Sequence, residues 1–440
     1  MTSRPEVRPP RGDWTGAGFE TRQIHAGELQ DDPSGARITP VYLTGAYRFD
    51  SFDHAHERFA GIEEGPVYSR HGNPTNGVAE RRVADLEGGS GAVLVASGTA
   101  AIATTMLALA GSGERIVSQS SIYSGTRLLF ERTLARAGVA TDWVWEPRDA
   151  AAWEEAITPA TRAVFIETIP NPKGDLADIG LVTRVAEQHG LPVVVDNTVA
   201  TPAVFRPIEH GAHIVVHSST KYLSGHGAAL SGVVVDGGVF DWSAAADRYP
   251  LLARSRTAEA PSFLDRFGRS RAFEGYLRFT TVTDLGPAPS PWHGFLLQQG
   301  METLSLRMER HLANARAVAE YLDGHPRVAA VDYAGLPSHP DHDLAVRHLG
   351  GEGGPVFSFT VRGGADGARR VFDTLTVFSR MTNIGDVRSM VLHPATTTHG
   401  SFDDETNRRL GVEPGMLRLS IGLETVGDLI ADLAAALDAA

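Results

Sequence analysis

Short apolar runs alternate with longer amphipathic stretches through the middle of the chain. Helical periodicity begins near residues 99, 123 and 178, between runs that have the length of strands. These strand-like runs fall at residues 92–96, 115–118, 163–167, 193–196 and 214–216. The run at 193–196 would be apolar on both faces of a strand, which is typical of a parallel sheet covered on both sides. The alternation predicts an α/β domain with helices on both faces of its sheet.

Residues that favour helix ends mark the start of this regular region. Asn73 and Pro74 predict an N-cap and a first helical position, and Gly88-Gly89 predicts the end of that helix. Residues 251–272 are rich in arginine and aperiodic, so we expect a long loop or insertion there.

The C-terminal third has a different pattern, which we interpret as a smaller α+β domain packed on the first. It predicts a long amphipathic helix at 294–324, strands near 327–333 and 355–361, and helices from about 365 and 425. The predicted organisation is an N-terminal arm (1–65), a large domain (66–300) and a C-terminal domain (301–440).

Composition narrows the possible functions. The 440 residues include 53 acidic and 40 basic side chains, and the net charge of −13 disfavours nucleic acid or an anionic membrane as a partner. Cysteine is absent, which excludes thiol catalysis, cysteine-bound zinc, iron–sulfur clusters and disulfides. No apolar run approaches the ~18 residues of a membrane span. Residues 1–14 lack a signal-peptide pattern and predict a disordered arm, so we expect a cytoplasmic protein.

Lysine is scarce in this chain. Only two of the 40 basic residues are lysines, Lys173 and Lys221, so a function that needs a deprotonatable amine has two side chains to choose from. Lys221 follows the predicted strand at 214–216, near Ser218 and Thr220 and just before a glycine-rich turn. A lysine at a strand end is usually a solvated surface group, but here arginine fills almost every ordinary basic position. The scarcity therefore favours a functional role for Lys221.

Two further segments place polar groups directly after predicted strands. Asp196 ends the run at 193–196, and ligands of open α/β sheets bind beyond the carboxyl ends of strands. Gly98 and Thr99 follow the run at 92–96 and open a helix, whose free N–H groups and dipole suit a phosphate. Each feature alone is also typical of an ordinary cap or turn.

Together these groups supply a phosphate cradle, a carboxylate and an amine, which are the three requirements of pyridoxal phosphate (PLP). Its aldehyde condenses with a lysine, its phosphate needs N–H and hydroxyl donors, and its ring nitrogen needs a carboxylate to stay protonated. The patterns G-x-G-x-x-G and G-x-x-x-x-G-K-[ST] do not occur at a strand-to-helix turn, and G-x-S-x-G is absent. His213 and His217 are too far apart along a strand for one metal, and HPDHD (339–343) is better interpreted as a polar turn, so we predict no metal.

Longer motifs carry a resemblance to a known family. They occur in order at 68–89 (YSRHGNPTNGVAERRVADLEGG), 193–198 (VVVDNT), 213–227 (HIVVHSSTKYLSGHG), 301–311, 383–400 and 416–424. With them the chain resembles the PLP-dependent Cys/Met-metabolism enzymes of fold type I, from about residue 19 to the C-terminal helix. It is most similar to the O-acetylhomoserine sulfhydrylases, because Asn383-Ile384-Gly385 stands where the cystathionine enzymes usually have Ser-Leu-Gly. The resemblance implies a mostly parallel seven-stranded sheet covered by helices, with a smaller α+β C-terminal domain.

The resemblance also implies roles for individual residues. Lys221 would form the Schiff base with PLP and act as the base, and Tyr123 and Tyr68 would join it as catalytic residues. Arg418 and Asn383 would bind the substrate, with Arg418 holding its α-carboxylate. Lys173 matches no family role. The implied cofactor contacts are Asp196 to the ring nitrogen, Tyr123 stacked on the ring, Asn171 to the 3′ oxygen, Gly98, Thr99, Ser218 and Thr220 to the phosphate, and Tyr68 and Arg70 to the phosphate of the neighbouring subunit's site.

The implied reaction is γ-replacement on an O-acylhomoserine, with sulfide or methanethiol as nucleophile and homocysteine or methionine as product. Residues 43–47, Thr283 and Trp292-His293 depart from the family pattern, and several of them lie in segments that line its substrate entrance. A different nucleophile, or a γ-elimination lyase, therefore stays an alternative. A catalytically silent binding subunit is a third possibility, against which the intact set of site residues argues. The shared sites imply a homo-oligomer, a dimer of dimers.

Overall fold

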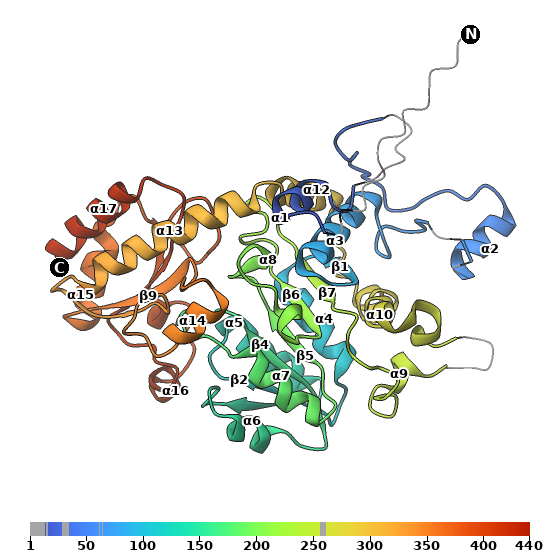
Figure 1. Ribbon diagram of the computed structural model, residues 1–440, viewed down its shortest axis with the longest axis horizontal. Coiled ribbons are helices and arrows are strands. Elements are labelled where there is room, and N and C mark those ends of the chain that lie inside the picture. Colours follow the sequence, from blue (N-terminus) through green and yellow to red (C-terminus); the bar gives the residue numbers. More distant parts are fainter. Residues whose placement is uncertain (1–13, 15, 29–34, 61, 64, 256–260) are drawn as a thin grey trace, which may run out of the picture.

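A seven-stranded sheet lies at the centre of the larger part of the molecule (Figure 1). The computed structural model describes residues 14, 16–28, 35–60, 62–63, 65–255 and 261–440. The strand order is β1-β7-β6-β5-β4-β2-β3, and every neighbouring pair is parallel except the two that β7 makes. This confirms the predicted mostly parallel sheet. The strands are β1 (Gly91–Val95), β2 (Arg115–Gln119), β3 (Ala140–Val144), β4 (Thr161–Glu167), β5 (Val193–Asp196), β6 (Ile214–His217) and β7 (Gly232–Asp236).

Helices cover both faces of this sheet, as the doubly apolar strands predict. Val193 and Val195 point into a core shared with α3 (Pro74–Glu87) and α7 (Ile179–Gln188). Val194 points into the opposite core, shared with α4 (Gly98–Leu109) and α10 (Phe263–Leu277). Because successive strand residues face opposite sides, β5 is buried along almost its whole length.

The predicted ends of the first regular helix are confirmed. The side chain of Asn73 accepts a hydrogen bond from the N–H of Thr75 at 3.0 Å, and Pro74 occupies the first helical position. Gly88 closes the helix with a φ of 76°, a left-handed conformation that suits glycine. This helix therefore begins and ends where local chemistry predicts.

A five-stranded sheet forms the smaller part of the molecule, with the order β10-β11-β12-β9-β8. Only the β10–β11 pair is parallel. Three helices share its core: α13 (Leu304–Asp323), α15 (Gly364–Thr374) and α17 (Val426–Asp438). This confirms a smaller α+β unit, while the domain boundaries at 65 and 300 stay predictions. The strands are β8 (Val328–Asp332), β9 (Val356–Val361), β10 (Ser379–Arg380), β11 (Met390–Leu392) and β12 (Met416–Ser420).

The structure corrects three local predictions. The helix predicted at 294–324 is two helices, α12 (Pro291–Met301) and α13, because Thr303 leaves helical geometry. Within the segment predicted as a loop at 251–272, helix α9 (Pro250–Ala253) is followed by α10, which begins with a capping box between Ser262 and Asp265. Gly268 interrupts α10 with a φ of 69°, so no continuous periodicity marks it. Strands β3, β7, β10, β11 and β12 were not predicted.

The remaining elements are mostly short. The arm prediction for residues 1–14 falls almost wholly outside the described residues, and none of the described helices is long and apolar enough to cross a membrane. The other α-helices are α1 (Phe19–His25), α2 (Phe52–Ala60), α5 (Ser124–Leu128), α6 (Ala150–Ala156), α8 (Thr201–Val204), α11 (Thr283–Leu285), α14 (His342–His348) and α16 (Asp404–Arg409). The π-helices are Leu129–Leu134 and Arg278–Val282, and the 3₁₀ turns are Pro207–His210 and Pro394–Thr396.

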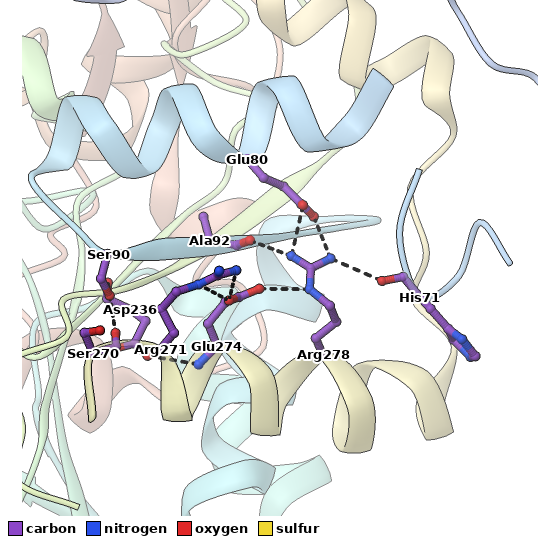
Figure 2. Close-up of polar contacts among 9 residues, drawn as sticks. All are labelled: His71, Glu80, Ser90, Ala92, Asp236, Ser270, Arg271, Glu274 and Arg278. Carbon is purple, nitrogen blue, oxygen red and sulfur yellow. Dashed lines mark hydrogen bonds and ion pairs between the residues drawn. The ribbon is translucent and has the colours of Figure 1, made fainter. Parts of the chain in front are cut away.

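A buried ion network ties the edge strand β1 to helices α3 and α10 (Figure 2). The guanidinium of Arg278 binds Glu80 on α3 at 2.9 Å and Glu274 on α10 at 2.9 Å. It also donates to the carbonyl oxygens of Ala92 at 2.8 Å and His71 at 3.3 Å. A buried charge is tolerated when its donors are paired in this way. The network fixes the loop that precedes α3 against α10.

Candidate active site

One cavity opens at the carboxyl edge of the large sheet and reaches the smaller sheet. Its walls include nine of the residues that the sequence predicts for the cofactor and substrate: Gly98, Thr99, Tyr123, Asn171, Asp196, Ser218, Thr220, Lys221 and Arg418. These residues come from six separate segments of the chain, so the fold, and not local sequence, brings them together. The cavity is the site that open α/β sheets offer beyond their strand ends.

Lys221 lies in the turn that follows β6. Its backbone N–H donates to the carbonyl of Ser218 at 3.1 Å, which turns the side chain into the cavity wall. Its Nζ donates to Oδ1 of Asn383 at 2.5 Å. Burial, with a smaller contribution from the charge of Arg418, lowers the pKa of Lys221 to about 8. A neutral amine is therefore accessible near physiological pH, as a nucleophile and base require.

The start of α4 approaches the end of β6 unusually closely. A Cβ atom at Gly98 would lie 2.5 Å from Cβ of Ser218, so only glycine fits there. Ser97 caps the helix by accepting from the N–H of Ala100 at 3.1 Å. Gly98 and Thr99 thus carry the first N–H groups of the helix, which have no partner within it, to the cavity beside the Ser218 hydroxyl. This cradle fits a phosphate.

Thr220 has a different hydrogen-bond pattern from the one expected of a phosphate donor. Its hydroxyl donates to the carbonyl of Ser231 at 3.1 Å and accepts from the N–H of Ser231 at 3.0 Å. In this arrangement it fixes the turn that carries Lys221, although it also lines the cavity. The phosphate contact of Thr220 stays a prediction.

Asp196 ends β5 and presents a carboxylate to the same cavity. Its Oδ1 accepts from the N–H of Thr198 at 2.9 Å and from the Thr198 hydroxyl. Burial raises the pKa of Asp196, whereas the bonds from Thr198 and the neighbouring His217 lower it. The hydroxyl of Thr198 in turn accepts from the N–H of Ser218 at 2.8 Å, which joins the ends of β5 and β6. A carboxylate at this depth fits a protonated ring nitrogen.

Arg418 lies on β12, the central strand of the smaller sheet, and is buried. One terminal nitrogen donates to the backbone carbonyl of Asn383 at 2.9 Å, but its Nε has no hydrogen-bond partner. Among the described residues, no carboxylate pairs with it. Burial lowers its pKa to about 10, which leaves the guanidinium charged at neutral pH. A buried cation with an orphaned donor in a cavity wall fits a ligand carboxylate.

The structure places the other predicted residues less directly. Asn383 contacts Lys221, and its neighbours Thr382 and Ile384 line the cavity. Tyr68 and Arg70 are exposed on the loop before α3, with the guanidinium 5.2 Å from the ring centre, and they are not among the lining residues. Their contact with a neighbouring subunit's site stays a prediction.

Sequence reasoning missed Glu167 in the cavity wall. It ends β4 as Asp196 ends β5, and the two residues are partners in the parallel register. The predicted strand at 163–167 already ended on this carboxylate, so the signal was present but not used. Thr198 was also missed, although it lies in the cavity wall two positions after Asp196, within the motif VVVDNT.

The HPDHD segment, weighed as a metal site, belongs to a polar cluster away from the cavity wall. Ligand atoms of His339, Asp341 and Asp175 lie within 4.8 Å of one another. Arg148 donates to both carboxylate oxygens of Asp341, at 2.6 and 2.7 Å. The carboxylate of Asp332 accepts a 2.9 Å hydrogen bond from Nε2 of His339. These partners favour a hydrogen-bonded turn.

A mostly parallel sheet with a lysine, a carboxylate and a phosphate cradle along its carboxyl edge, closed by a smaller α+β unit, defines a fold type I PLP-dependent enzyme. The chain belongs to the Cys/Met metabolism PLP-dependent enzyme family, whose pattern it matches over residues 20–438. This membership confirms the family and cofactor that the motifs predicted.

Individual relatives are similar over nearly their whole length. An O-acetyl-L-homoserine sulfhydrylase from Corynebacterium glutamicum is 43% identical, with 94% of this chain and 96% of that protein covered. A homocysteine synthase from Schizosaccharomyces pombe is 42% identical, with 96% and 98% covered. A crystal structure from Campylobacter jejuni, assigned as an O-acetylhomoserine (thiol)-lyase and carrying N′-pyridoxyl-lysine-5′-monophosphate, has a TM-score of 0.90, 34% identity, and coverage of 96% of this chain and 100% of its own.

Proposed function

We propose that this enzyme replaces the γ-acetoxy group of O-acetylhomoserine with the sulfur of sulfide, so that the Cγ–O bond breaks, a Cγ–S bond forms, and homocysteine and acetate are produced. The observation that carries the proposal is the contact between Lys221 and Asn383, next to the orphaned guanidinium of Arg418. It sets a base beside the cation that would hold the amino acid's carboxylate. The names of the sulfhydrylase and synthase relatives support the choice of substrate and nucleophile.

The residues present fit PLP. Gly98, Thr99 and Ser218 would hold its phosphate, Asp196 its ring nitrogen, and Lys221 its aldehyde carbon. Tyr123 would cover the ring and Asn171 would contact the 3′ oxygen. When bound, PLP withdraws electrons from the amino acid, so that the proton on Cα, which bears the amino group, becomes acidic, and after it a proton on Cβ.

The chain's own groups then bind the substrate and move its protons. Arg418 would bind the α-carboxylate and so fix which bond at Cα faces Lys221. The Lys221 amine would remove the proton from Cα and then act at Cβ, which allows the acetate to leave from Cγ. Its lowered pKa suits this repeated exchange, because an amine with pKa about 8 both accepts and returns protons near neutral pH. Asn383 would hold the amine in place between transfers.

We also propose that the active form is a homo-oligomer with shared sites. The exposed positions of Tyr68 and Arg70 support this, because within one chain neither lines the cavity. A dimer of dimers and a cytoplasmic location remain predictions from the sequence.

Product analysis tests the proposed function. The PLP-loaded protein is incubated with O-acetyl-L-homoserine, with and without sulfide, and the amino acids are separated. Homocysteine that forms only with sulfide supports the proposal. Ammonia and a 2-oxo acid without sulfide would show an eliminating lyase, and the absence of homocysteine when sulfide is present would move the assignment to another nucleophile.

A further inference from the structure

Glu167 is a buried carboxylate in the cavity wall that the proposed mechanism does not use. It is 5% exposed and stands opposite Asp196 in the register of β4 and β5. Residues paired in this way on parallel strands point to the same side of the sheet, so two carboxyl groups lie side by side. Burial, and then the charge of Asp196, raise the pKa of Glu167. Such a costly arrangement needs a compensating interaction.

The compensating interaction reaches the residue expected to cover the cofactor ring. Oε1 of Glu167 accepts a hydrogen bond from the backbone N–H of Tyr123 at 2.8 Å. The backbone N–H of Asn171 also lowers the pKa of Glu167, and hence favours its ionised form. One carboxylate therefore meets the backbone of two of the segments that carry predicted cofactor contacts, the turn before α5 and the loop after β4.

The ring of Tyr123 has its own support. It lies so close to Gly125 that a Cβ atom there would collide with the ring. The carbonyl of Tyr123 accepts from the N–H groups of Thr126 and Arg127, at 2.9 and 3.1 Å, so the residue also begins α5. Gly125 and α5 thus fix the ring relative to its own backbone. What fixes that backbone relative to the sheet is the bond to Glu167.

We propose that Glu167 is a positioning residue, which acts as a hydrogen-bond acceptor that holds Tyr123 so that its ring covers the cofactor. The inference rests on the proposed function, since it assumes that PLP lies between Tyr123 and the wall formed by Asp196. It assigns the effect to the acceptor oxygen and not to the charge. A glutamine at the same position, which keeps an acceptor oxygen, should therefore serve almost as well.

The rate of PLP release measures this role without any turnover. Holoenzyme is mixed with an excess of a second apoenzyme that captures free PLP, and the loss of PLP from the holoenzyme is followed by its absorbance. Glu167→Leu should release PLP about tenfold faster, because the Tyr123 N–H loses a buried partner. Glu167→Gln should stay within about twofold of the native rate. Equal acceleration by both variants would overturn the proposal, because it would assign the effect to charge.

A double-mutant cycle tests whether Glu167 acts through Tyr123. In a Tyr123→Ala background, Glu167→Leu should change the release rate by less than about twofold. The same tenfold factor in both backgrounds would overturn the proposal. If the Glu167→Leu variant does not fold, the Glu167→Gln variant decides: PLP release about tenfold faster than from the native protein would also overturn the proposal. A native protein that binds no PLP would instead contradict the proposed function.

Discussion

Nζ of Lys221 lies 2.5 Å from Oδ1 of Asn383, although 162 positions separate the two residues. The contact joins the turn after β6 of the large sheet to the segment before β11 of the smaller sheet. The amine is therefore positioned by both parts of the molecule, and its reach depends on how they pack.

Variants of the two residues should differ in how far they lower turnover, because Lys221 would take part in the reaction whereas Asn383 would only position its amine. Lys221→Ala should lower turnover by on the order of 10³-fold or more, because the cofactor's attachment point and the base disappear together. Asn383→Ala should lower kcat/KM only about tenfold, since it removes one hydrogen bond to the amine. Both are measured as sulfide-dependent homocysteine formation. Undiminished steady-state turnover by Lys221→Ala would contradict its assignment.

The orphaned donor of Arg418 predicts a shape requirement for the protein cation that binds the substrate's α-carboxylate. Arg418→Lys keeps a positive charge but loses the planar fork that matches a carboxylate. We expect KM for O-acetylhomoserine to rise about tenfold, with PLP content unchanged. Steady-state kinetics and cofactor absorbance give the two values. An unchanged KM would place the α-carboxylate elsewhere.

The close approach of α4 to β6 predicts that Gly98 tolerates no side chain. Gly98→Ala should weaken PLP binding about tenfold or more, because its Cβ would displace Ser218 from the phosphate cradle. Gly427→Ala is the matched control, since nothing lies within 4 Å of its added Cβ. Equilibrium titration with PLP compares the two variants. Equal affinities would contradict the cradle.

Shared sites predict complementation between two impaired variants. Arg70→Ala should weaken PLP retention in the partner's site, and Lys221→Ala should inactivate its own. After random 1:1 mixing and reassembly, about one quarter of the sites should combine an intact Lys221 with an intact Arg70. Activity is measured before and after mixing. If mixing restores nothing, Arg70 does not act across subunits.

Asp236, beside the Arg278 network (Figure 2), predicts a pH-dependent contribution to stability. Burial raises its pKa to about 7, so the folded protein binds a proton that the unfolded chain loses near pH 4. Its contribution to the free energy of unfolding is full below pH 4 and falls as the pH rises towards 7. Relative to Asp236→Asn, the native protein should therefore lose stability between pH 5 and 8. Melting temperatures of both proteins at the two pH values measure this, and parallel curves would contradict it.

The sequence predicted most of the large sheet because burial on both faces leaves continuous apolar runs such as Val193-Val194-Val195. It also predicted Asp196, which ends such a run, and Lys221, one of only two lysines, in the turn that follows another. Strand β3 escaped prediction because at the sheet edge it mixes polar and apolar residues, and its first four positions are only half-buried. The break between α12 and α13 depends on the conformation of Thr303, which no residue pattern announces.

Contacts made by backbone groups were beyond the reach of sequence patterns. The acceptor role of Glu167 toward Tyr123 joins residues 44 positions apart through an N–H that every residue carries. The Thr220 hydroxyl lies in a motif that implies a phosphate contact, yet its partner in the structure is the backbone of Ser231. Side-chain identity alone does not distinguish these uses.

The Arg278 network has a consequence for how the chain tolerates change in length. Arg278 donates a hydrogen bond to the backbone carbonyl of His71, so the loop that carries Tyr68 and Arg70 is anchored to a helix about 200 positions later in the chain. An insertion or deletion between 262 and 278 would shift that anchor, and it would displace the exposed Tyr68 and Arg70, which do not line this chain's own cavity. Helix α10, which lies largely within the segment expected to be a loop, thus helps to set the position of the exposed loop before α3.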